Sequence, residues 1–320
     1  MRWVVTGGVG FIGHHLCRAL LARGDEVVVV DDFSDAPYPR TWKRENQRRL
    51  ESEPGADRFR VVTACVTDRE AMKPCFEGAD GVVHLAGLAG VRPSFREPAR
   101  YARVNVEGTA VTLELARAAG AKRYLFASSS SVYGNSTPLP AREDAPSIEP
   151  ESPYAATKRS AELVASSIAR VARELPITAL RFFTVYGPRQ RPEMAITLFM
   201  RAALEGRPVT LFGDGSMRRD FTHVDDIVRG VLGAMEKAPP GFRAYNLGSG
   251  APIRLDALVE AIGDVAKKPL AVERGPVPPG DVDATFADVS RAKAELGYAP
   301  RVPLREGLET VRDALRADLA

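Results

Sequence analysis

The chain has 320 residues, of which 45% are hydrophobic and 27% are charged, proportions close to those of ordinary globular domains. This composition argues against a disordered chain and against a fibrous repeat. The 44 basic and 41 acidic residues give a formal net charge of +3. Because the basic residues are scattered along the chain, we expect no nucleic-acid partner.

The cysteines and the apolar runs favour a cytoplasmic protein. Cys17, Cys65 and Cys75 are odd in number and lack the spacing of a metal site, which favours buried thiols in a reducing compartment. The apolar run after the N-terminal Met-Arg is too short for the core of a signal peptide, and no run is long enough to span a membrane. We therefore expect a cytoplasmic location, no membrane association and no bound metal.

The first half of the chain alternates predicted strands with predicted helices. Short β-branched runs predict strands at 3–6, 26–31, 59–63, 81–85, 123–127 and 177–182. Helical patterns lie between them at 12–23, 68–77, 99–119 and 153–174. This alternation predicts an α/β fold, a Rossmann-type doubly wound parallel sheet with right-handed crossovers.

After about residue 185 the pattern loosens, which indicates a second, smaller lobe. Pro- and Gly-rich stretches at 187–192, 239–241 and 276–280 separate helical patterns at 224–236, 255–267, 289–296 and 304–319. We expect a Rossmann domain over residues 1–180 together with about 219–248. The smaller C-terminal α/β lobe is expected to comprise about 181–218 and 249–320.

The first strand runs into a glycine-rich turn that reads TGGVGFIG from Thr6 to Gly13. Such glycines let the backbone approach a pyrophosphate, whose charge then faces the N-terminus of the following helix. The second strand ends in Asp31-Asp32, near the distance at which an acidic side chain meets the adenosine ribose. A carboxylate there repels a 2′-phosphate and favours NAD over NADP, although Arg40 or Lys43 could neutralise that repulsion.

A Tyr-x-x-x-Lys pattern follows the fifth predicted strand. Ser152 and Pro153 can begin a helix that carries Tyr154 and Lys158 on one face. An ammonium beside a phenol lowers the pKa of the phenol, so the pair predicts a general base for a substrate hydroxyl. Taken alone, the pattern more often represents two exposed side chains on the surface of a helix. The hydroxyls of Ser128–Ser131, at the carboxyl edge of the sheet, favour catalysis.

These ordered motifs resemble the extended short-chain dehydrogenase/reductase superfamily, in its nucleotide-sugar epimerase and dehydratase branch. They include HLAG at 84–87, Asn105, SSSVYG at 129–134, YAATK at 154–158, VYGP at 185–188, FGDGSMRRDFTHVDDIVRG at 212–230 and YNLGSG at 245–250. The likeness covers nearly the whole chain. It implies a bound NAD, a UDP-sugar substrate for the smaller lobe, and a homodimer formed through the helices at 99–119 and 153–174.

The resemblance assigns Tyr154, Lys158 and Ser129 to catalysis. The residues expected to bind NAD are Gly7, Gly10, Phe11, Ile12, Gly13, Asp31, Asp32, Ser34, Cys65, Val66, Leu85, Ala86, Gly87, Asn105, Ser128, Tyr154, Lys158, Phe182 and Val185. Two residues depart from the family pattern. Cys65 stands where many relatives carry an Asp that contacts adenine, and Pro278 stands where a polar or basic residue is common.

For the nucleotide sugar, the resemblance places Arg219 at the diphosphate and Phe212 over the base, with Asp281 as a late acidic residue. The residues expected to bind substrate are Ser129, Ser130, Ser131, Thr184, Arg189, Arg191, Phe212, Arg219 and Asp281. Dehydratases of the branch carry an acidic pair just before VYG, and nucleotide-glucuronate decarboxylases carry a Glu there. Because this chain has Ser130 and Ser131, the remaining chemistry is oxidation and re-reduction at one carbon, which is epimerisation.

The segment Arg189–Ala195 after VYGP resembles that of bacterial UDP-glucuronate 4-epimerases, as does Thr184 in place of a common Asn. A guanidinium grips a carboxylate in bidentate fashion, and Arg191 is the first candidate, with Arg189 the second. We therefore expect an NAD-dependent isomerase that converts UDP-glucuronate to UDP-galacturonate through a transient 4-keto intermediate. The alternatives are a UDP-glucose or UDP-N-acetylglucosamine 4-epimerase, a UDP-glucuronate decarboxylase, and a non-catalytic NAD-binding regulator. Both arginines could also hold only phosphate or solvent.

Overall fold

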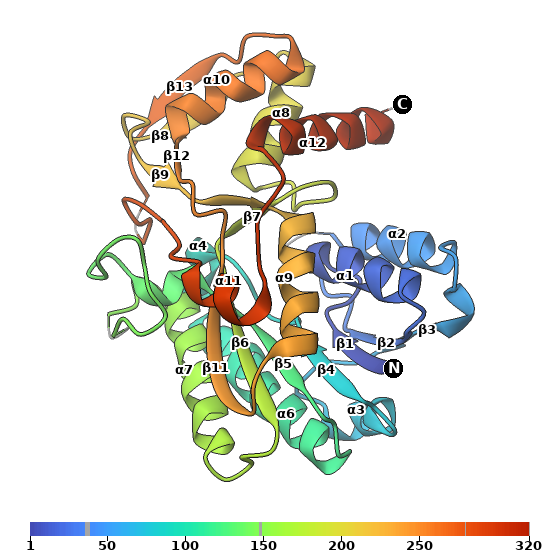
Figure 1. Cartoon of the computed structure of the whole chain (residues 1–320). Helices are drawn as coiled ribbons and strands as arrows, with labels where there is room; N and C mark the ends of the chain where they lie inside the picture. The colour runs from blue at the N-terminus through green and yellow to red at the C-terminus, as the bar shows by residue number, and fades with distance from the viewer. Residues whose placement is uncertain (36–38, 147–148, 279, 320) are drawn as a thin grey trace.

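The computed structural model describes residues 1–35, 39–146, 149–278 and 280–319 (Figure 1). Within these residues, a seven-stranded parallel sheet has the order β11-β6-β5-β4-β1-β2-β3. The strands are β1 (Arg2–Thr6), β2 (Glu26–Asp31), β3 (Phe59–Thr63), β4 (Gly81–His84), β5 (Tyr124–Ser129), β6 (Pro176–Phe182) and β11 (Gly241–Leu247). The strand order reverses between β1 and β4, where doubly wound sheets bind their ligands. The predicted Rossmann-type fold is confirmed.

Alternate residues of each central strand enter two separate cores, because helices cover both faces of the sheet. Val27 and Val29 of β2 pack in the cluster that contains Leu16 of α1 (Phe11–Ala22), whereas Val28 and Val30 pack in the cluster that contains Met72 of α3 (Arg69–Phe76). The first cluster also contains residues of α9 (Val224–Lys237) and α11 (Ser290–Leu296). The second also contains residues of α6 (Gly108–Ala118) and α7 (Pro153–Ala169). The near-continuous valine run of β2 therefore reflects burial on both faces.

The smaller lobe lies beyond the carboxyl ends of the strands (Figure 1). It pairs β8 (Val209–Phe212) with β13 (Val272–Gly275), and β9 (Arg218–Arg219) with β12 (Ile253–Arg254). Its hydrophobic core is formed largely by α8 (Ala195–Glu205), α10 (Leu255–Ala266) and α12 (Leu304–Leu319). The short pair β7 (Thr184–Tyr186) and β10 (Phe221–His223) runs between the two lobes. The domain boundaries stay a prediction. The pairing of β11 with β6 and the packing of α9 in the core beside the sheet are consistent with including about 219–248 in the Rossmann domain.

The remaining elements are short or peripheral. They are α2 (Arg40–Glu51), α4 (Val91–Arg96), α5 (Pro98–Ala102) and the turns Ala56–Arg58, Arg103–Glu107 and Ser130–Tyr133. The helix predicted at 99–119 is interrupted, since a π-helical turn at Arg103–Glu107 separates α5 from α6. The strand predicted to end at residue 127 continues to Ser129, and β11 was not predicted at all. Among the described residues, no helix is both long and apolar enough to span a membrane.

The glycine-rich turn between β1 and α1 is packed too closely for residues that have a side chain. Gly7 has a φ of 69°, and a Cβ there would lie 2.7 Å from the backbone nitrogen of Ala86. A Cβ on Gly13 would lie 2.2 Å from the carbonyl oxygen of Gly7 and 2.7 Å from the Cα of Gly8. These neighbours are backbone atoms and cannot rotate away, so the turn requires glycine at both positions.

We predict that Gly7→Ala destabilises the fold through overpacking by about 1–3 kcal/mol, in addition to a left-handed backbone penalty of about 1–2 kcal/mol. Gly120→Ala is the control, because its φ of 71° is close to the 69° of Gly7 but no atom lies within 4 Å of the added Cβ. Its cost is the backbone penalty alone, about 1–2 kcal/mol. Melting temperatures of both variants measure the difference. A Gly7→Ala variant at least as stable as Gly120→Ala would contradict the close packing of the turn.

Candidate active site

A cavity of about 1250 Å³ opens along the carboxyl ends of the parallel strands. Its wall includes the glycine-rich turn, Asp31 at the end of β2, Ser129 at the end of β5 and Phe182 at the end of β6. The opposite wall comes from the smaller lobe and includes Phe212 and Arg219. Since drug-sized ligands occupy roughly 300–1,000 Å³, this cavity has room for two ligands side by side.

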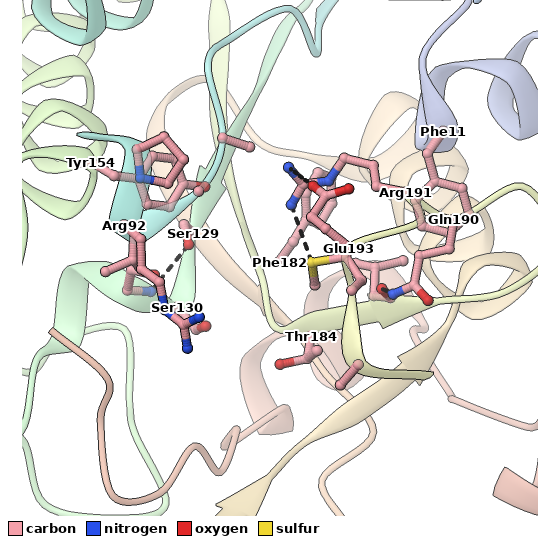
Figure 2. A pocket seen from close by; sticks show the side chains of 18 of the residues that line it. Phe11, Arg92, Ser129, Ser130, Tyr154, Phe182, Thr184, Gln190, Arg191 and Glu193 are labelled. Atoms are coloured by element: carbon pink, nitrogen blue, oxygen red, sulfur yellow. Dashed lines mark hydrogen bonds and ion pairs between the residues drawn. The ribbon is translucent and has the colours of Figure 1, made fainter. Parts of the chain in front are cut away.

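Most of the predicted site residues line this cavity. From the expected NAD set these are Gly7, Gly10, Phe11, Ile12, Gly13, Asp31, Asp32, Ser34, Val66, Leu85, Ala86, Gly87, Ser128, Tyr154, Lys158, Phe182 and Val185. From the expected substrate set they are Ser129, Ser130, Ser131, Thr184, Arg191, Phe212, Arg219 and Asp281. Figure 2 shows Tyr154, Ser129, Ser130 and Arg92 on one side of the cavity, with Arg191, Glu193 and Gln190 across from them. The fold thus brings residues from distant parts of the sequence to one edge of the sheet.

Three predicted residues, Cys65, Asn105 and Arg189, do not line the cavity. The Cys65 Sγ lies 3.2 Å from the Thr67 hydroxyl. The buried Asn105 accepts a hydrogen bond from the Leu88 N–H at 2.8 Å and donates one to the Leu88 carbonyl at 3.0 Å. Asn105 therefore holds the loop after β4, which does line the cavity, so its contact is indirect. Pro279, next to the family departure at Pro278, lies outside the described residues.

The end of β2 pairs its carboxylate with a lysine. Asp31 is buried, and its Oδ1 accepts hydrogen bonds from the Phe33 N–H at 2.9 Å and from the Lys43 Nζ at 3.2 Å. Burial raises the pKa of Asp31, and the Lys43 charge opposes that rise. Arg40, the other basic residue considered in the sequence, instead pairs with Asp35 at 2.8 Å. Lys43 also lines the cavity, so an ion pair borders the position expected for the ribose.

The helix α7 presents Tyr154 and Lys158 to the cavity as its spacing predicts. Ser152 caps the helix, since its hydroxyl accepts a hydrogen bond from the Ala155 N–H at 3.2 Å. The Lys158 Nζ donates to the carbonyl of Ala127 on β5 at 2.8 Å. This bond fixes the lysine at the edge of the sheet.

The predicted lowering of the phenol pKa is wrong for this structure. Burial raises the pKa of Tyr154, because it destabilises the phenolate more than the neighbouring groups stabilise it. The groups that oppose this rise are the hydrogen-bonded Ser129 side chain and the Arg191 guanidinium. Lys158 is oriented toward the Ala127 carbonyl, and its own pKa is lowered to about 8 by burial.

Glu162, one helical turn beyond Lys158, raises the pKa of that lysine. It accepts hydrogen bonds from the Ser128 hydroxyl at 2.6 Å and from the Arg181 Nε and Nη2, both at 2.8 Å. Although burial opposes the shift, Arg181 holds the pKa of Glu162 below its usual value. Our sequence reasoning missed this pair. The i,i+4 spacing of Glu162 from Lys158 could have revealed its position on the same helix face.

Two arginines, one from each lobe, line the cavity near Phe212 and Asp281. Burial lowers the pKa of Arg219, whose Nη1 donates to the carbonyls of Arg218 at 2.9 Å and Asp283 at 3.3 Å. Arg92, which was not singled out from the sequence, lies 4.7 Å above the ring of Phe212 and 3.4 Å from Asp281. These groups make this end of the cavity suited to an anionic, partly aromatic ligand.

Arg191 faces the catalytic residues across the cavity (Figure 2). Its Nη1 lies 3.0 Å from the Glu193 carboxylate, and its Nη2 contacts the Met194 sulfur at 3.2 Å. Because a thioether is a weak acceptor, that arm of the guanidinium can turn to a stronger one. Among the described residues, no group of three or more His, Cys, Asp or Glu side chains is arranged to hold a metal ion.

The model of the NAD dependent epimerase/dehydratase family matches residues 3–248, and the chain belongs to this family. A probable UDP-glucuronate 4-epimerase of Rhizobium meliloti is 37% identical, over 96% of this chain and 95% of the relative. A UDP-glucuronate 4-epimerase of Thermodesulfobacterium geofontis is 38% identical, over 96% and 94% of the two chains.

Solved structures agree with this assignment. A mutant UDP-glucuronic acid 4-epimerase from Bacillus cereus, in complex with UDP-4-deoxy-4-fluoro-glucuronic acid and NAD, superposes with a TM-score of 0.92 at 34% identity, covering 99% of each chain. A UDP-glucose 4-epimerase from Thermotoga maritima, with UDP-glucose, gives a TM-score of 0.89 at 34% identity, covering 100% of each chain. The family and the fold are therefore shown by sequence and by structure.

The pKa of Lys158 predicts an alkaline limb in the pH dependence of kcat/KM. Lys158 is cationic below about pH 8 and neutral above it, so kcat/KM should fall as the pH rises through that value. Glu162→Gln removes the carboxylate that raises the Lys158 pKa, and the limb should move to lower pH. Ser128→Ala is the control, because it removes one hydrogen bond to Glu162 but keeps its charge. Identical profiles for Glu162→Gln and the unaltered enzyme would rule out this dependence.

Proposed function

We propose that this chain is a UDP-glucuronate 4-epimerase, which interconverts UDP-glucuronate and UDP-galacturonate through a transient 4-keto intermediate with bound NAD. The observation that carries the proposal is the composition of the cavity. Tyr154, Ser129 and Lys158 lie at the sheet edge, with Ser130 and Ser131 where a carboxyl would be needed for dehydration, and Arg191 lies across from them. The relatives that bear this name, at 37–38% identity over nearly the full chain, support it.

NAD fits the half of the cavity built on β1 and β2. The turn at Gly7 and Gly13 leaves space that a Cβ would fill, so the pyrophosphate would meet the N-terminus of α1. Asp31 would accept hydrogen bonds from the adenosine ribose, and Lys158 would hold the nicotinamide ribose. When bound, NAD supplies the hydride acceptor and a positively charged ring.

Tyr154 takes the proton from the sugar O4 as C4 is oxidised, and Ser129 holds O4 by a hydrogen bond. The Ser129 bond and the Arg191 charge oppose the effect of burial on the Tyr154 pKa, which favours the phenolate needed for this step. The 4-keto sugar then turns about its diphosphate linkage, so that hydride returns to the opposite face. Tyr154 returns the proton to O4, and NAD is regenerated in each cycle.

The substrate carboxylate needs restraint once C4 is a ketone. A carboxylate β to a ketone tends to leave as carbon dioxide when its bond aligns with the carbonyl π-system. Arg191 and the hydroxyls of Ser130 and Ser131 are the groups proposed to hold the carboxylate out of that alignment. Arg219 is proposed to bind the diphosphate, with Phe212 over the base and Asp281 beside it.

A neutral-sugar 4-epimerase is the second candidate. The observation that favours it is the 3.0 Å contact between Arg191 and Glu193, which neutralises the cation proposed for the carboxylate. The glucose of UDP-glucose has no carboxylate and would need no free cation at this position. The Met194-facing arm of Arg191 remains available to a carboxylate, and we therefore keep UDP-glucuronate as the first choice.

We also propose that the enzyme is a homodimer through α6 and α7. The two helices lie side by side at the outer face of the sheet (Figure 1), and α7 carries the exposed apolar residue Leu163, with an exposed fraction of 53%. A pair of such faces would form a four-helix bundle and remove this surface from water. The cytoplasmic location expected from the sequence stays a prediction.

Proton NMR of a reaction started with UDP-glucuronate should show the galacturonate product without added reductant. Tyr154→Phe should lower kcat by about 10²–10⁴-fold, the usual contribution of a positioned acid or base, with NAD content and melting temperature retained. Tyr101→Phe is the matched control, because that neighbouring phenol donates only to the Ala89 carbonyl at 3.0 Å. Near-normal turnover by Tyr154→Phe would overturn the mechanism, and a pentose product would show a decarboxylase.

Arg191→Ala should raise KM for UDP-glucuronate by about 10- to 100-fold, the effect of losing charge-assisted hydrogen bonds worth about 1.5–3 kcal/mol. The same variant should release pentose, because the carboxylate is no longer held away from the ketone. The measurement is steady-state kinetics with product analysis, and UDP binding is the control. Unchanged kinetics with UDP-glucuronate would argue against Arg191 as the carboxylate ligand.

A further inference from the structure

The loop that carries Arg191 has an unusual backbone. Arg189, two residues earlier, has a φ of 65°, in the left-handed region that favours glycine. A residue other than glycine persists there only when its surroundings hold it. Arg189 was also the second candidate for the carboxylate, yet its side chain does not line the cavity.

Arg189 instead contacts α2, in the NAD-binding half of the molecule, and α12, in the smaller lobe. Its Nε donates to the Oδ1 of Asn46 on α2, and its Nη1 lies 4.0 Å from Asp318 on α12. Only 10% of the Arg189 side chain is exposed. Asn46, which is 1% exposed, donates its amide Nδ2 to the Val9 carbonyl at 2.8 Å. One buried amide therefore joins the glycine-rich turn to the loop that carries Arg191.

Two further contacts hold this loop. The His15 ring nitrogen Nε2 lies 2.9 Å from the Pro188 carbonyl, which fixes the loop to α1. The buried Gln190 donates to the Val185 carbonyl at 2.8 Å and accepts from the Thr197 hydroxyl at 2.8 Å. The Arg189 side chain is thus directed away from the cavity, whereas Gln190 and Arg191 line it.

We propose that Asn46 and Arg189 are positioning residues that set Arg191 for the substrate carboxylate without touching substrate themselves. This inference rests on the proposed function, in which Arg191 binds that carboxylate. Without the link from Asn46 to Arg189, the left-handed turn is free to relax. The Arg191 guanidinium then moves away from the position in which it binds the sugar carboxylate. The diphosphate and base, held by the smaller lobe, are unaffected, so the effect is selective for the carboxylate.

The test compares dissociation constants of the NAD-loaded enzyme for UDP-glucuronate and for UDP, which lacks the carboxylate. Arg189→Gly removes the side chain and suits the observed φ, so the fold should tolerate it. UDP-glucuronate should bind about tenfold more weakly, and UDP should change by less than about twofold. Lys267→Gly is the matched control. Lys267 is also a basic residue with a left-handed backbone, with a φ of 58°, and it lies at the end of α10 away from the cavity. It should change neither constant.

A double-mutant cycle separates positioning from direct contact. If Arg189 acts through Arg191, adding Arg189→Gly to Arg191→Ala should change UDP-glucuronate binding by less than about twofold. Asn46→Leu, which removes both hydrogen bonds of the amide, should reproduce the selective loss. Melting temperatures of all variants distinguish this loss from unfolding.

Each outcome decides between the two proposals. If Arg191→Ala weakens UDP-glucuronate but Arg189→Gly does not, the positioning role is wrong and the proposed function stands. Equal weakening of UDP and UDP-glucuronate by Arg189→Gly, or full additivity with Arg191→Ala, also overturns the positioning role. If Arg191→Ala leaves UDP-glucuronate binding unchanged, the carboxylate contact in the proposed function fails, and the positioning role fails with it.

Discussion

The site depends on keeping the cation of Lys158 buried at the carboxyl edge of the sheet. Burial of a lone ammonium is costly, and it lowers the pKa of Lys158 to about 8. The Ala127 carbonyl accepts one of its protons, and Glu162 places a negative charge one helical turn away. Glu162 is in turn paired with the buried Arg181 from β6. The catalytic helix and two neighbouring strands are thereby joined through one set of buried charges.

The opposite wall of the cavity must bind an anionic ligand. Its arginines therefore cannot be fully occupied by the carboxylates that neighbour them in the protein. Arg219 donates to backbone carbonyls, and Arg191 has the carboxylate neighbour Glu193. Arg92, on the Tyr154 side of the cavity, reaches across to Asp281. These contacts stabilise the arginines and leave donors for a ligand that brings a diphosphate and a carboxylate. The two walls meet around the position proposed for the sugar C4.

Sequence reasoning succeeded where a residue's role is local. The valine runs of β1 and β2, the glycine-rich turn and the capped start of α7 follow from neighbours in the chain. It failed at β11 (Gly241–Leu247), whose pairing with β6 is long-range, and at the helix predicted over 99–119, which a π-helical turn interrupts. It also expected a lowered phenol pKa from spacing alone, although burial of Tyr154 depends on elements far away in the sequence.

The sequence by itself determined the order of elements, the family and the residue types at the reactive edge, because these depend on periodicity and short motifs. The tertiary structure alone decided which of two nearby arginines faces the cavity. The sequence ranked Arg191 ahead of Arg189 but left both open, and in the structure the left-handed turn and the amide of Asn46 direct Arg189 away. Similarly, the partners of Lys158 and Lys43 were fixed only by folding. Such choices depend on distances between segments that are remote along the chain, and a sequence pattern does not contain those distances.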